Sequence, residues 1–548
     1  MARWIVCSAW PYANSVPHLG TFIHLISADV YARYLSMKGE EVVAVSGSDE
    51  HGTPIEVEAM RRGVGPREIT DANHGRILEL LREYLVERVY YTRTESPTHV
   101  SFVRDFYRRI EERGFVFERE VEMPFCPKDG IFLPDRFVVG TCPYCGYEEA
   151  KGDQCDRCGK LLEPTMLINP RCAICGSRPE IRRTRHWYFD LPRFSDSLRN
   201  YIESNGRLPE AVRNASLRMI EEGLRPRSLT RDNRWGIPAP FRGAEGKTIY
   251  VWMEAVLGYL SAVKELGERS GRPELFDLFW RSPDSRPVCF MGKDNVPFHA
   301  IIFPALLLAS GEGYPLPWQI SSTEYLTMEG EKFSKSAGVG IWMDRALRVA
   351  DGETWRFVAM YMRPESRDVS FSWREFSRVV NAELNDNLGN FIHRVLTLAR
   401  RRFGPEPPPC GDGGAMRELA SSYLASYVSH MDSFRIRDAA RAILELSAEG
   451  NSRLSAEKPW EALRAGDPEV DRSLCGYLSA LDAIAIMLYP FMPRRSGALW
   501  SMLGRQGSPE GSRAVLPPPN RASLGEPSPL FSKVPGSPEE LQRIYEGS

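Results

Sequence analysis

The sequence predicts a multidomain α/β protein in which a parallel-sheet domain is interrupted by a cysteine-rich module and followed by an all-α helical bundle. Three observations support this: a strand–helix–strand pattern near the N-terminus, seven cysteines confined to residues 126–175, and successive amphipathic helices beyond residue 374. A chain of 548 residues exceeds one ordinary core, so about three domains are expected.

The parallel sheet is predicted from the first 50 residues. Residues 4–9 (WIVCSA) and 42–47 (VVAVSG) have the apolar character of buried strands, and residues 19–37 between them have a helical pattern. Such a unit has parallel strands joined by a right-handed crossover. Tyr12 and His18 follow the first strand, and Asp49, Glu50 and His51 follow the second. Because open α/β sheets bind ligands at the carboxyl ends of their strands, these side chains are candidate site residues.

Composition places the chain among soluble globular proteins. Hydrophobic residues make up 43% and charged residues 26%, and no apolar run reaches the length of a membrane span. The N-terminal MARWIVCSAWPYAN leads directly into the HLG element, so it is expected to be a core strand rather than a signal peptide. A cytoplasmic protein is therefore expected.

Charge leaves the choice of partner open. The net charge of −2 neither requires nor excludes a nucleic acid, and arginines cluster within residues 182–185, 225–234 and 400–402. Each cluster is either solvated surface or a source of phosphate contacts to a polyanion.

The cysteine-rich module contains a strong metal-binding pattern. Cys142-x2-Cys145 is followed after nine residues by Cys155-x2-Cys158, and paired CxxC knuckles at this spacing hold one tetrahedral zinc ion with four thiolates. Disulfides are the competing interpretation, which a cytosolic setting disfavours.

A second metal site is a weaker prediction. Cys172 and Cys175 need two further ligands, and Cys126 with Asp129 is the best remaining pair, which gives an unusual Cys₃Asp set. Four-ligand sites of either kind are closed and therefore structural. The remaining cysteines lie in apolar stretches of the sequence and are expected to be small, buried hydrophobic residues: Cys7, Cys289, Cys410 and Cys475.

Two further segments have the groups that a bound triphosphate needs. Lys332 and Lys335 lie in the Ser- and Gly-containing segment EKFSKSAG (331–338), and His18 and Gly20 lie in PYANSVPHLGT (11–21). Ammonium groups, imidazole N–H and exposed backbone amides stabilise negative charge on a phosphate in the transition state. The sequence has no GxxxxGK[ST] motif, so the phosphates are expected to be held differently.

Together these segments resemble the paired HIGH and KMSKS signatures of class I aminoacyl-tRNA synthetases. Here they are His18-Leu19-Gly20-Thr21 and Lys332-Phe333-Ser334-Lys335-Ser336. The resemblance narrows to the methionyl-tRNA synthetase family, in the archaeal-like form with two zinc knuckles. It rests on SAWPYAN (8–14), GSDEHGTP (47–54), FLPDRFVVGTCPYCG (132–146), YVWMEAVLGY (250–259) and MGKDNVPFH (291–299).

This resemblance implies a Rossmann-like parallel-sheet catalytic domain with an inserted zinc-knuckle module, followed by an all-α bundle. It also implies a methionine–tRNA ligase that forms methionyl-adenylate from methionine and ATP. The methionyl group would then pass to the 3′ end of tRNA(Met), including initiator tRNA, for protein synthesis. The implied cofactors are one or two zinc ions and Mg²⁺ with ATP, and the chain is expected to be a monomer without a membrane partner.

The catalytic domain is expected in two halves, 1–117 and 228–325, separated by the zinc-binding connective insert at 118–227. A KFSKS-containing stem-contact region is expected at 326–373 and the helical anticodon-binding bundle at 374–503. Residues 504–548 are expected to form a linker and C-terminal tail.

The resemblance also assigns site residues. The catalytic residues are His18, Thr21, Lys332 and Lys335. ATP would contact His18, Gly20, Gly292, Lys293, Asp294 and Lys335. Methionine would contact Trp10, Tyr12, Asp49, Trp252, Ala255, Val256, Tyr259 and His299. The anticodon would contact Asn390, Arg394 and Trp460.

Chemistry agrees with these roles. Asp49 can pair with the substrate ammonium, and aromatic walls from Tyr12 and Trp252 suit a polarizable thioether. Asn390 and Arg394, one turn apart, combine with Trp460 to offer the amides, guanidinium and aromatic plane that recognise unpaired bases. Without the resemblance, the aromatic residues are better interpreted as packing residues. Asn390 and Arg394 are then better interpreted as part of a solvated helix face.

The sequence departs from the family pattern at four positions. Thr21 replaces the second signature histidine, and Phe333 replaces the central methionine of KMSKS. Trp10 and Val256 occupy pocket positions that are often Leu and Pro. Thr21 is therefore expected to offer a hydroxyl donor in place of an imidazole, and the contacts with methionine are expected to differ in detail.

The bundle begins with a predicted helix over residues 375–402. Its apolar residues recur at helical spacing and are expected to form one buried stripe: Leu384, Leu388, Phe391, Ile392, Val395 and Ala399.

Two rival functions remain open. Another class I synthetase, such as one for Cys, Leu, Ile or Val, is disfavoured because an insert of about 110 residues devoted to Cys knuckles leaves little room for an editing domain. A zinc-ribbon nucleic-acid-binding protein on a Rossmann-like scaffold leaves Lys332, Lys335 and the Gly292-Lys293-Asp294 element unexplained.

Overall fold

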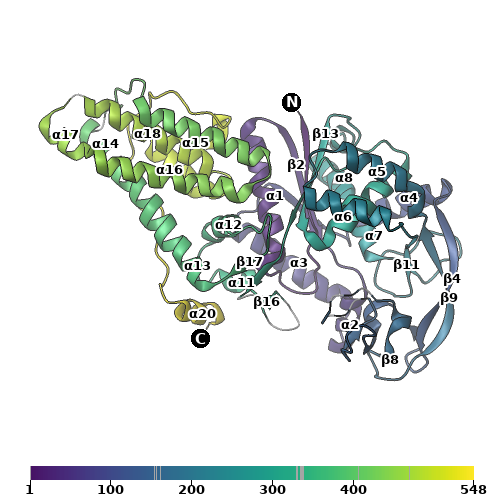
Figure 1. The fold of residues 1–548 in the computed structure, drawn as a ribbon. Helices are drawn as coiled ribbons and strands as arrows, with labels where there is room; N and C mark the ends of the chain where they lie inside the picture. Colours follow the sequence, from purple (N-terminus) through teal and green to yellow (C-terminus); the bar gives the residue numbers. More distant parts are fainter. Residues whose placement is uncertain are drawn as a thin grey trace.

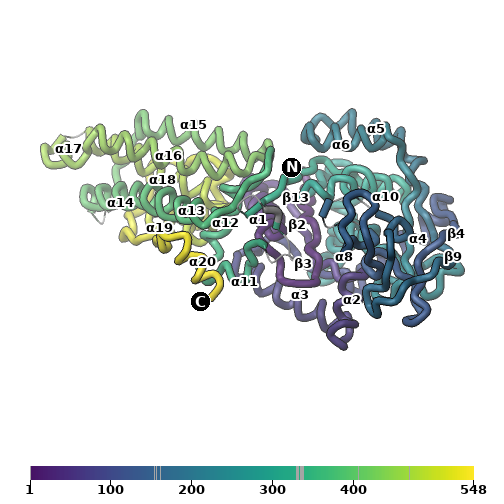
Figure 2. The backbone as a smooth tube through the Cα atoms, turned by 60° about the horizontal axis from the view of Figure 1, so that its bottom comes forward, coloured from purple at the N-terminus to yellow at the C-terminus, as the bar shows by residue number. Residues whose placement is uncertain are grey.

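The computed structural model describes residues 2–153, 155, 157–158, 160, 162–328, 331–333, 339–404, 406–467 and 469–547. Figures 1 and 2 show a sheet domain with its insert at one end of the molecule and a helical bundle at the other. Lys335, one of the predicted catalytic residues, lies outside the described residues, as does the side chain of Lys332. No helix among these residues combines the length and the apolar character needed to cross a membrane.

The sheet has five parallel strands in the order β14-β13-β1-β2-β3. Their bounds are β1 (Arg3–Ser8), β2 (Glu41–Ser48), β3 (Val89–Arg93), β13 (Ser285–Gly292) and β14 (Gln319–Thr323). The two strands predicted in the first 50 residues are thus confirmed, together with helix α1 (Leu19–Lys38). The order of strand addition reverses at β1, so the carboxyl ends of β1 and β13 flank the topological switch point.

Two hydrophobic cores cover the two faces of this sheet. Alternate residues of β1 point to opposite faces, so Trp4 and Val6 join one core while Ile5 and Cys7 join the other. The first core includes α1 and continues into the helical bundle, and the second includes α8 (Gly258–Ser270) and α10 (Phe303–Ser310). Because α1 is buried on nearly every side, it packs against both the sheet and the bundle.

The remaining helices of the sheet domain are α2 (Thr53–Arg62), α3 (Pro66–Glu83), α4 (Pro97–Glu112), α7 (Val251–Ala255), α9 (Leu275–Trp280) and the π-helical turn η5 (Phe298–Ile302).

The insert is built on a long two-stranded ribbon. β4 (Val116–Cys126) and β9 (Glu180–Phe189) pair antiparallel, with β5 (Ile131–Phe132) and β10 (Arg227–Ser228) at the edges. A small sheet of β6 (Val138–Thr141), β7 (Ala150–Lys151) and β8 (Ile168–Cys172) lies at its tip. Helices α5 (Ser195–Ser204) and α6 (Glu210–Glu221) instead bury their apolar residues in the second core of the sheet domain.

The first arginine cluster lies on this ribbon. Arg185 pairs with Glu118 at 3.1 Å, and Arg183 lies 3.6 Å from Glu120 across the two strands. These side chains are largely exposed, which favours the solvated-surface interpretation at this place.

A connecting region joins the sheet domain to the bundle. It contains β15 (Leu326–Met328), β16 (Glu331–Lys332) and β17 (Val369–Phe371), with α11 (Met343–Ala346) and α12 (Gly352–Tyr361). Arg356 of α12 is fully buried and donates hydrogen bonds to Asp29 of α1 at 2.7 Å and to the carbonyl oxygen of Phe491 at 2.9 Å. This guanidinium therefore ties the two ends of the molecule together.

The bundle comprises α13 (Trp373–Arg378), the π-helical segment η6 (Val379–Gly389), α14 (Asn390–Phe403), α15 (Gly414–Asp432), α16 (Ile436–Glu457), α17 (Pro459–Ala465), α18 (Glu469–Leu488) and α19 (Pro493–Met502). The helix predicted over 375–402 is present, with η6 in its middle, and the predicted apolar stripe is buried throughout. The C-terminal α20 (Pro538–Glu546) returns to α11 and α13, where Tyr545 Oη accepts a hydrogen bond from the backbone N–H of Trp342 at 2.7 Å.

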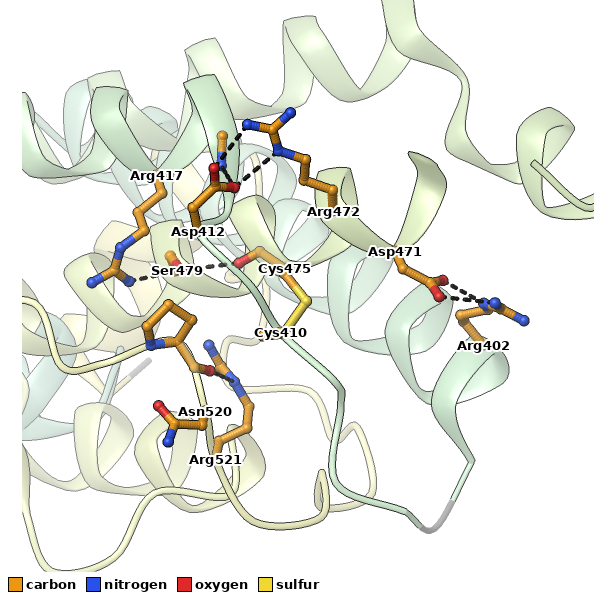
Figure 3. Close-up of a disulfide and its surroundings, with 12 residues drawn as sticks. Arg402, Cys410, Asp412, Arg417, Asp471, Arg472, Cys475, Ser479, Asn520 and Arg521 are labelled. Carbon is orange, nitrogen blue, oxygen red and sulfur yellow. Dashed lines mark hydrogen bonds and ion pairs between the residues drawn. A yellow bond between two sulfur atoms is a disulfide. The ribbon is translucent and has the colours of Figure 1, made fainter. Parts of the chain in front are cut away.

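The prediction for the four cysteines outside the knuckles is half right. Cys7 and Cys289 are buried thiols opposite each other on β1 and β13. Cys410 and Cys475 are not separate buried thiols but form a disulfide (Figure 3). The prediction failed because nothing in the sequence shows that the segment after α14 crosses α18 beside Cys475.

Candidate functional site

The candidate site lies at the carboxyl edge of the parallel sheet, next to the switch point. Trp10 and Tyr12 follow β1, Asp49 follows β2, and the backbones of Tyr12 and Asp49 form a parallel bridge. His18 begins α1 at the same edge. The structure thus brings together the side chains that sequence patterning placed at strand ends.

The two signature segments are more than 300 residues apart in the sequence, and Phe333 of the second contacts His18 of the first at the N-terminus of α1. His18 caps this helix, and its Nδ1 accepts the backbone N–H of Thr21 at 3.2 Å. The Phe333 ring makes an edge contact with the His18 imidazole, with 5.4 Å between centroids. A Cβ at Gly20 would lie 3.2 Å from both side chains, so glycine allows this close approach.

The chain beyond the undescribed residues 334–338 also returns to this point. The backbone N–H of Leu19 donates to the carbonyl oxygen of Ile341 at 2.7 Å, and His18 forms an antiparallel bridge with Trp342. Phe333 and Trp342, on the two sides of this undescribed stretch, therefore both lie beside His18. Since Nδ1 of His18 acts as an acceptor, Nε2 is the ring nitrogen that can donate a hydrogen bond. The positive end of the α1 dipole lies beside this ring.

Asp49 is buried and holds an unused acceptor. Its Oδ1 has no hydrogen-bond partner among the described residues. Burial and then the nearby Glu254 carboxylate raise the pKa of Asp49 well above its usual range. A cationic group placed at Oδ1 would satisfy this oxygen and restore the ionised form.

Tyr259 and His299 form a buried polar pair on the same side of the sheet. His299 donates from Nδ1 to the carbonyl oxygen of Asn295 at 2.9 Å, so its Nε2 accepts the Tyr259 hydroxyl at 2.7 Å. Burial lowers the pKa of His299 to about 4, which keeps the ring neutral. Nearby, Trp252 stacks on Phe298 with 4.8 Å between centroids, although Trp252 is 41% exposed.

Trp10, one of the departures from the family pattern, is accommodated by two glycines. A Cβ at Gly47 would lie 2.6 Å from the indole, and a Cβ at Gly258 would overlap it. The indole also lies 5.7 Å from the buried His99 ring. The indole of Trp10 thus occupies the space that side chains at positions 47 and 258 would fill if those residues were not glycine. Ala255 ends α7 and Val256 follows it, with Val256 buried.

The Gly292-Lys293-Asp294 element follows β13 as expected. Lys293 Nζ lies 2.6 Å from a Glu324 carboxylate oxygen, and the Tyr325 hydroxyl donates to Asp294 Oδ1. The element is therefore held by the chain that follows β14, and the Lys293 charge is already neutralised within the protein.

One charged network was not predicted from the sequence. His51 lies between two carboxylates, with Nδ1 2.5 Å from Glu254 and Nε2 2.6 Å from Glu95. Burial lowers the pKa of His51, but the charge and hydrogen bonds of Glu254 and Glu95 outweigh it and raise the pKa to about 10. His51 and Glu254 lie within quoted motifs, but no spacing rule pairs residues that are 203 positions apart. The only signal was the polar cluster at the end of the second strand.

His24, a second residue without a predicted role, lies one turn into α1. Its Nε2 is 2.9 Å from the Thr323 hydroxyl, and a Cβ at Gly292 would lie 3.6 Å from the ring. Burial, and then Arg363 and His18, lower its pKa to about 3, so the ring is neutral. His24 therefore packs beneath Gly292, between the ends of β13 and β14.

The four knuckle cysteines converge as predicted. Cys142 Sγ lies 3.8 Å from Cys158 Sγ, and Cys145 Sγ lies 3.6 Å from Cys155 Sγ. Thiolates bound tetrahedrally to zinc at about 2.3 Å are about 3.8 Å apart. Burial raises the pKa of Cys142, but backbone N–H groups of Tyr144 and Cys145 lower it to about 7 and favour the thiolate. These residues fit a metal ion.

The second predicted group also converges. Asp129 Oδ2 lies 3.1 Å from both Cys126 Sγ and Cys172 Sγ, and Cys126 Sγ lies 3.5 Å from Cys175 Sγ. All four donor atoms lie within 4.8 Å of one another. The backbone N–H of Asp129 points to Cys126 Sγ at 3.4 Å, as in a metal-binding knuckle. The carboxylate thus takes the place of a fourth thiolate.

The predicted anticodon residues gather on one face of the bundle. Arg394 of α14 donates to Asn451 at 3.1 Å and lies 5.7 Å from the centre of the Trp460 ring. Ser455 lies 3.4 Å from Arg394, and Asn390 donates to the Asp386 carbonyl oxygen at 2.8 Å. Asn451 and Ser455 of α16 are part of this face and were missed, because their contact with α14 exists only in the folded bundle.

Two families match successive parts of the chain. The family described as "tRNA synthetases class I (M)" matches residues 4–396, and the "Anticodon binding domain of methionyl tRNA ligase" matches residues 411–542. The chain belongs to the class I tRNA synthetases of type M.

Curated relatives of this family match almost from end to end. A methionine–tRNA ligase of Korarchaeum cryptofilum is 53% identical over 97% of this chain and 96% of the relative. A methionine–tRNA ligase of Thermofilum pendens is 53% identical over 99% of this chain and 97% of the relative. Among class I synthetase structures, a Mycobacterium tuberculosis methionyl-tRNA synthetase in complex with methionyl-adenylate superimposes with a TM-score of 0.79. At 22% identity, covering 97% of this chain and 100% of that one, this likeness supports the fold.

Proposed function

We infer that the chain is a methionine–tRNA ligase. It activates methionine with ATP to form methionyl-adenylate and transfers the methionyl group to tRNA(Met), the initiator included. Family membership and relatives matched over nearly the whole chain support this function. The observation in the structure that supports it is the contact of Phe333 with His18 at the N-terminus of α1. The carboxyl edge of the sheet also holds Asp49, whose Oδ1 is buried without a partner among the described residues.

Methionine would bind at the carboxyl edge of the sheet. Asp49 Oδ1 would accept the substrate ammonium, which is the ligand that this buried oxygen lacks. Tyr12 and Trp252 offer aromatic contact to the thioether, and Trp10, Ala255 and Val256 complete the wall. The neutral His299 orients the Tyr259 hydroxyl near the sulfur.

ATP would bind across the switch point between β1 and β13. The methionine carboxylate attacks the α-phosphorus, and pyrophosphate leaves. His18 would stabilise the developing phosphate charge from Nε2, with the Thr21 hydroxyl, Lys332 and Lys335 beside it. Gly20 and Gly292 allow close approach, Lys293 supports the loop, and Asp294 would accept ribose hydroxyls. Mg²⁺ enters with ATP.

The terminal adenosine hydroxyl of tRNA then attacks the carbonyl carbon of the adenylate, and AMP leaves. Asn390, Arg394 and Trp460 would recognise the anticodon bases at the other end of the molecule. We propose the domain boundaries that the sequence predicts: a catalytic domain in two halves (1–117, 228–325), an insert (118–227), a stem-contact region (326–373) and a bundle (374–503).

The function is tested by ATP–pyrophosphate exchange measured with each of the twenty amino acids. Exchange is expected with methionine only. Exchange dependent on Cys, Leu, Ile or Val instead would assign the chain to another specificity within class I. Absence of exchange, with nucleic-acid binding retained, would favour a zinc-ribbon binding protein.

We also propose that both cysteine groups hold zinc as structural sites. The donors of Cys142, Cys145, Cys155 and Cys158 have the spacing of a tetrahedral thiolate site, and the Cys₃Asp group has the same backbone support. The ion would stabilise the fold of the insert, because a closed site contributes its binding free energy to folding.

Metal analysis of purified protein tests this. Two zinc ions per chain are expected, and Cys145→Ala and Cys175→Ala should each lose one. Unchanged zinc content in Cys145→Ala would contradict the first ligand set, and unchanged content in Cys175→Ala would contradict the second. We further propose that the protein is a cytoplasmic monomer. Sedimentation of the full chain would test its monomeric state.

A further inference from the structure

The disulfide between Cys410 and Cys475 joins two segments of the bundle that are 65 residues apart (Figure 3). Cys410 lies in residues 406–413, between α14 and α15, and this segment has no helix or strand. Cys475 is a fully buried residue of the central helix α18. The bond therefore fixes an irregular connection to the core of the bundle.

Two ion pairs flank this bond. Asp412 pairs with Arg472 through two hydrogen bonds of 2.8 and 2.9 Å, and Arg402 at the end of α14 pairs with Asp471. The Asp412 and Arg472 side chains are 68% and 56% exposed, and ion pairs as exposed as this contribute little to stability. The covalent bond is therefore the dominant restraint on the segment.

The backbone of this segment is also built for close contact with α18. A Cβ at Gly476 would overlap the carbonyl oxygen of Gly413, which ends the segment. Proline and glycine make up most of residues 406–413, so neither regular hydrogen bonding nor large apolar side chains hold it. Gly476 lets the chain pass directly over the helix beside Cys475.

The cross-link is selective among the cysteines. The nine others are free thiols; seven of them form the two candidate metal groups, and the other two lie buried on β1 and β13. A single bonded pair in a chain whose nine other cysteines are free thiols indicates a specific modification rather than general oxidation. The relatives are archaeal, and intracellular proteins of hyperthermophilic archaea are disulfide-rich.

We propose that Cys410 and Cys475 are an oxidative modification site, and that their disulfide is the covalent clamp that stabilises the anticodon-binding bundle against heat. The bond closes a loop that contains α15, α16 and α17, so it restricts the unfolded chain most strongly in this bundle. It also fixes the segment that follows α14, the helix carrying Asn390 and Arg394. The effect on stability does not depend on the proposed function; only the effect on tRNA charging does.

The reaction is a thiol–disulfide exchange with a small disulfide of the glutathione class. Cys410 is partly exposed, so its thiolate attacks the small disulfide, forms a mixed disulfide and releases one thiolate. The Cys475 thiolate then attacks the Cys410 sulfur and releases the second thiolate. The two protein thiols lose two protons and two electrons, and the small disulfide is reduced to two thiols.

Peptide mass spectrometry of the full chain tests the modification directly. Protein alkylated under denaturing, non-reducing conditions and then digested should give the Cys410 and Cys475 peptides as one linked species, unalkylated and lighter by two hydrogens than the two free peptides together. Full alkylation of both cysteines would overturn the proposal.

Thermal unfolding tests the clamp. Cys410→Ser leaves the buried Cys475 in place and should lower the melting temperature of the bundle by roughly 5–15 °C. A phosphine reductant should lower the wild-type melting temperature to the same value and leave the variant unchanged. Asp412→Asn, which removes only the exposed ion pair, should change it by less than about 3 °C. Equal melting of wild type and Cys410→Ser, or an equal effect of reductant on both, would overturn the clamp.

Activity separates this proposal from the proposed function. At a temperature between the two melting points, Cys410→Ser should lose tRNA aminoacylation and keep pyrophosphate exchange. If the chain activates no amino acid, the ligase assignment fails while the melting experiment still decides the clamp. If exchange is lost together with aminoacylation at that temperature, the stabilisation is not confined to the bundle and the clamp is contradicted.

Discussion

At the carboxyl edge of the sheet, Asp49 Oδ1 and Trp10 Nε1 are buried without a partner among the described residues. On the proposed anticodon face of the bundle, Arg394 and Asn390 already hydrogen-bond to protein groups. A buried polar atom left unpaired costs about 1–3 kcal/mol. The sheet edge therefore holds buried polar atoms that no described protein group satisfies, whereas the proposed anticodon face would exchange protein contacts for RNA contacts.

This contrast predicts where substitutions do most harm. A ligand at the sheet edge gains interactions that nothing else in the protein provides, so removing a group there should cause large losses. On the bundle the net gain from each RNA contact is smaller, because a protein contact is given up for it. The predictions below test this difference, from the largest effect to the smallest.

The largest effect is expected at the phosphate-binding end of α1. His18→Ala or Lys335→Ala should slow methionine-dependent pyrophosphate exchange by roughly 10²- to 10³-fold, the usual scale for one preorganised transition-state donor. The methionine KM should change little. His393→Ala, an exposed histidine on α14, is the matched control and should exchange at the wild-type rate. Wild-type exchange in Lys335→Ala would remove that residue from the chemistry.

The next effect is on substrate binding. Asp49→Asn should raise the methionine KM by about 10²-fold or more, because a buried charge partner is lost, with a smaller change in kcat. Because only the ionised carboxylate pairs with the ammonium, and burial raises its pKa, wild-type methionine KM should rise as the pH falls. Asp284→Asn, at the opposite edge of the sheet, is the control. An unchanged KM in Asp49→Asn would place the ammonium elsewhere.

A separate effect, on stability rather than on a reaction rate, is a pH dependence from His51. Its pKa of about 10 in the folded chain exceeds the unfolded value of about 6.5, so its stabilisation is complete below about pH 6.5 and is lost as pH rises toward 10. The free energy of unfolding should fall by up to about 1.4 kcal/mol per pH unit in this window. In His51→Gln this slope should disappear. An equal slope in wild type and variant would show that His51 is neutral in the folded protein.

Local patterns in the sequence were sufficient to predict most of the fold. Apolar runs predicted β1 and β2, and helical periodicity predicted the buried stripe of η6 and α14. CxxC spacing predicted the first cysteine group, and Cys172-x2-Cys175 with the remaining Cys126-x2-Asp129 predicted the second. The contacts at the candidate site followed from known motifs, which place His18 and Asp49 at strand ends. Such patterns work because each depends on residues close together in the sequence.

Features that depend on distant contacts were not predictable in this way. The carboxylates around His51 come from residues 95 and 254, and Asn451 reaches Arg394 from another helix. The Cys410–Cys475 bond depends on how an irregular segment crosses α18. Each is fixed by tertiary packing, which leaves no periodic signal in one sequence.

Trp460→Ala, assayed in both half-reactions, tests the central claim that chemistry and RNA recognition occupy separate ends of the molecule. Loss of a base stack worth about 1–3 kcal/mol should lower aminoacylation by roughly ten- to a hundredfold through tRNA binding. Trp460→Phe should retain most activity, since it keeps an aromatic plane. Pyrophosphate exchange without tRNA should be unchanged in both variants. If exchange and aminoacylation fall together, or if neither changes, Trp460 is a packing residue and the assignment of the anticodon face is wrong.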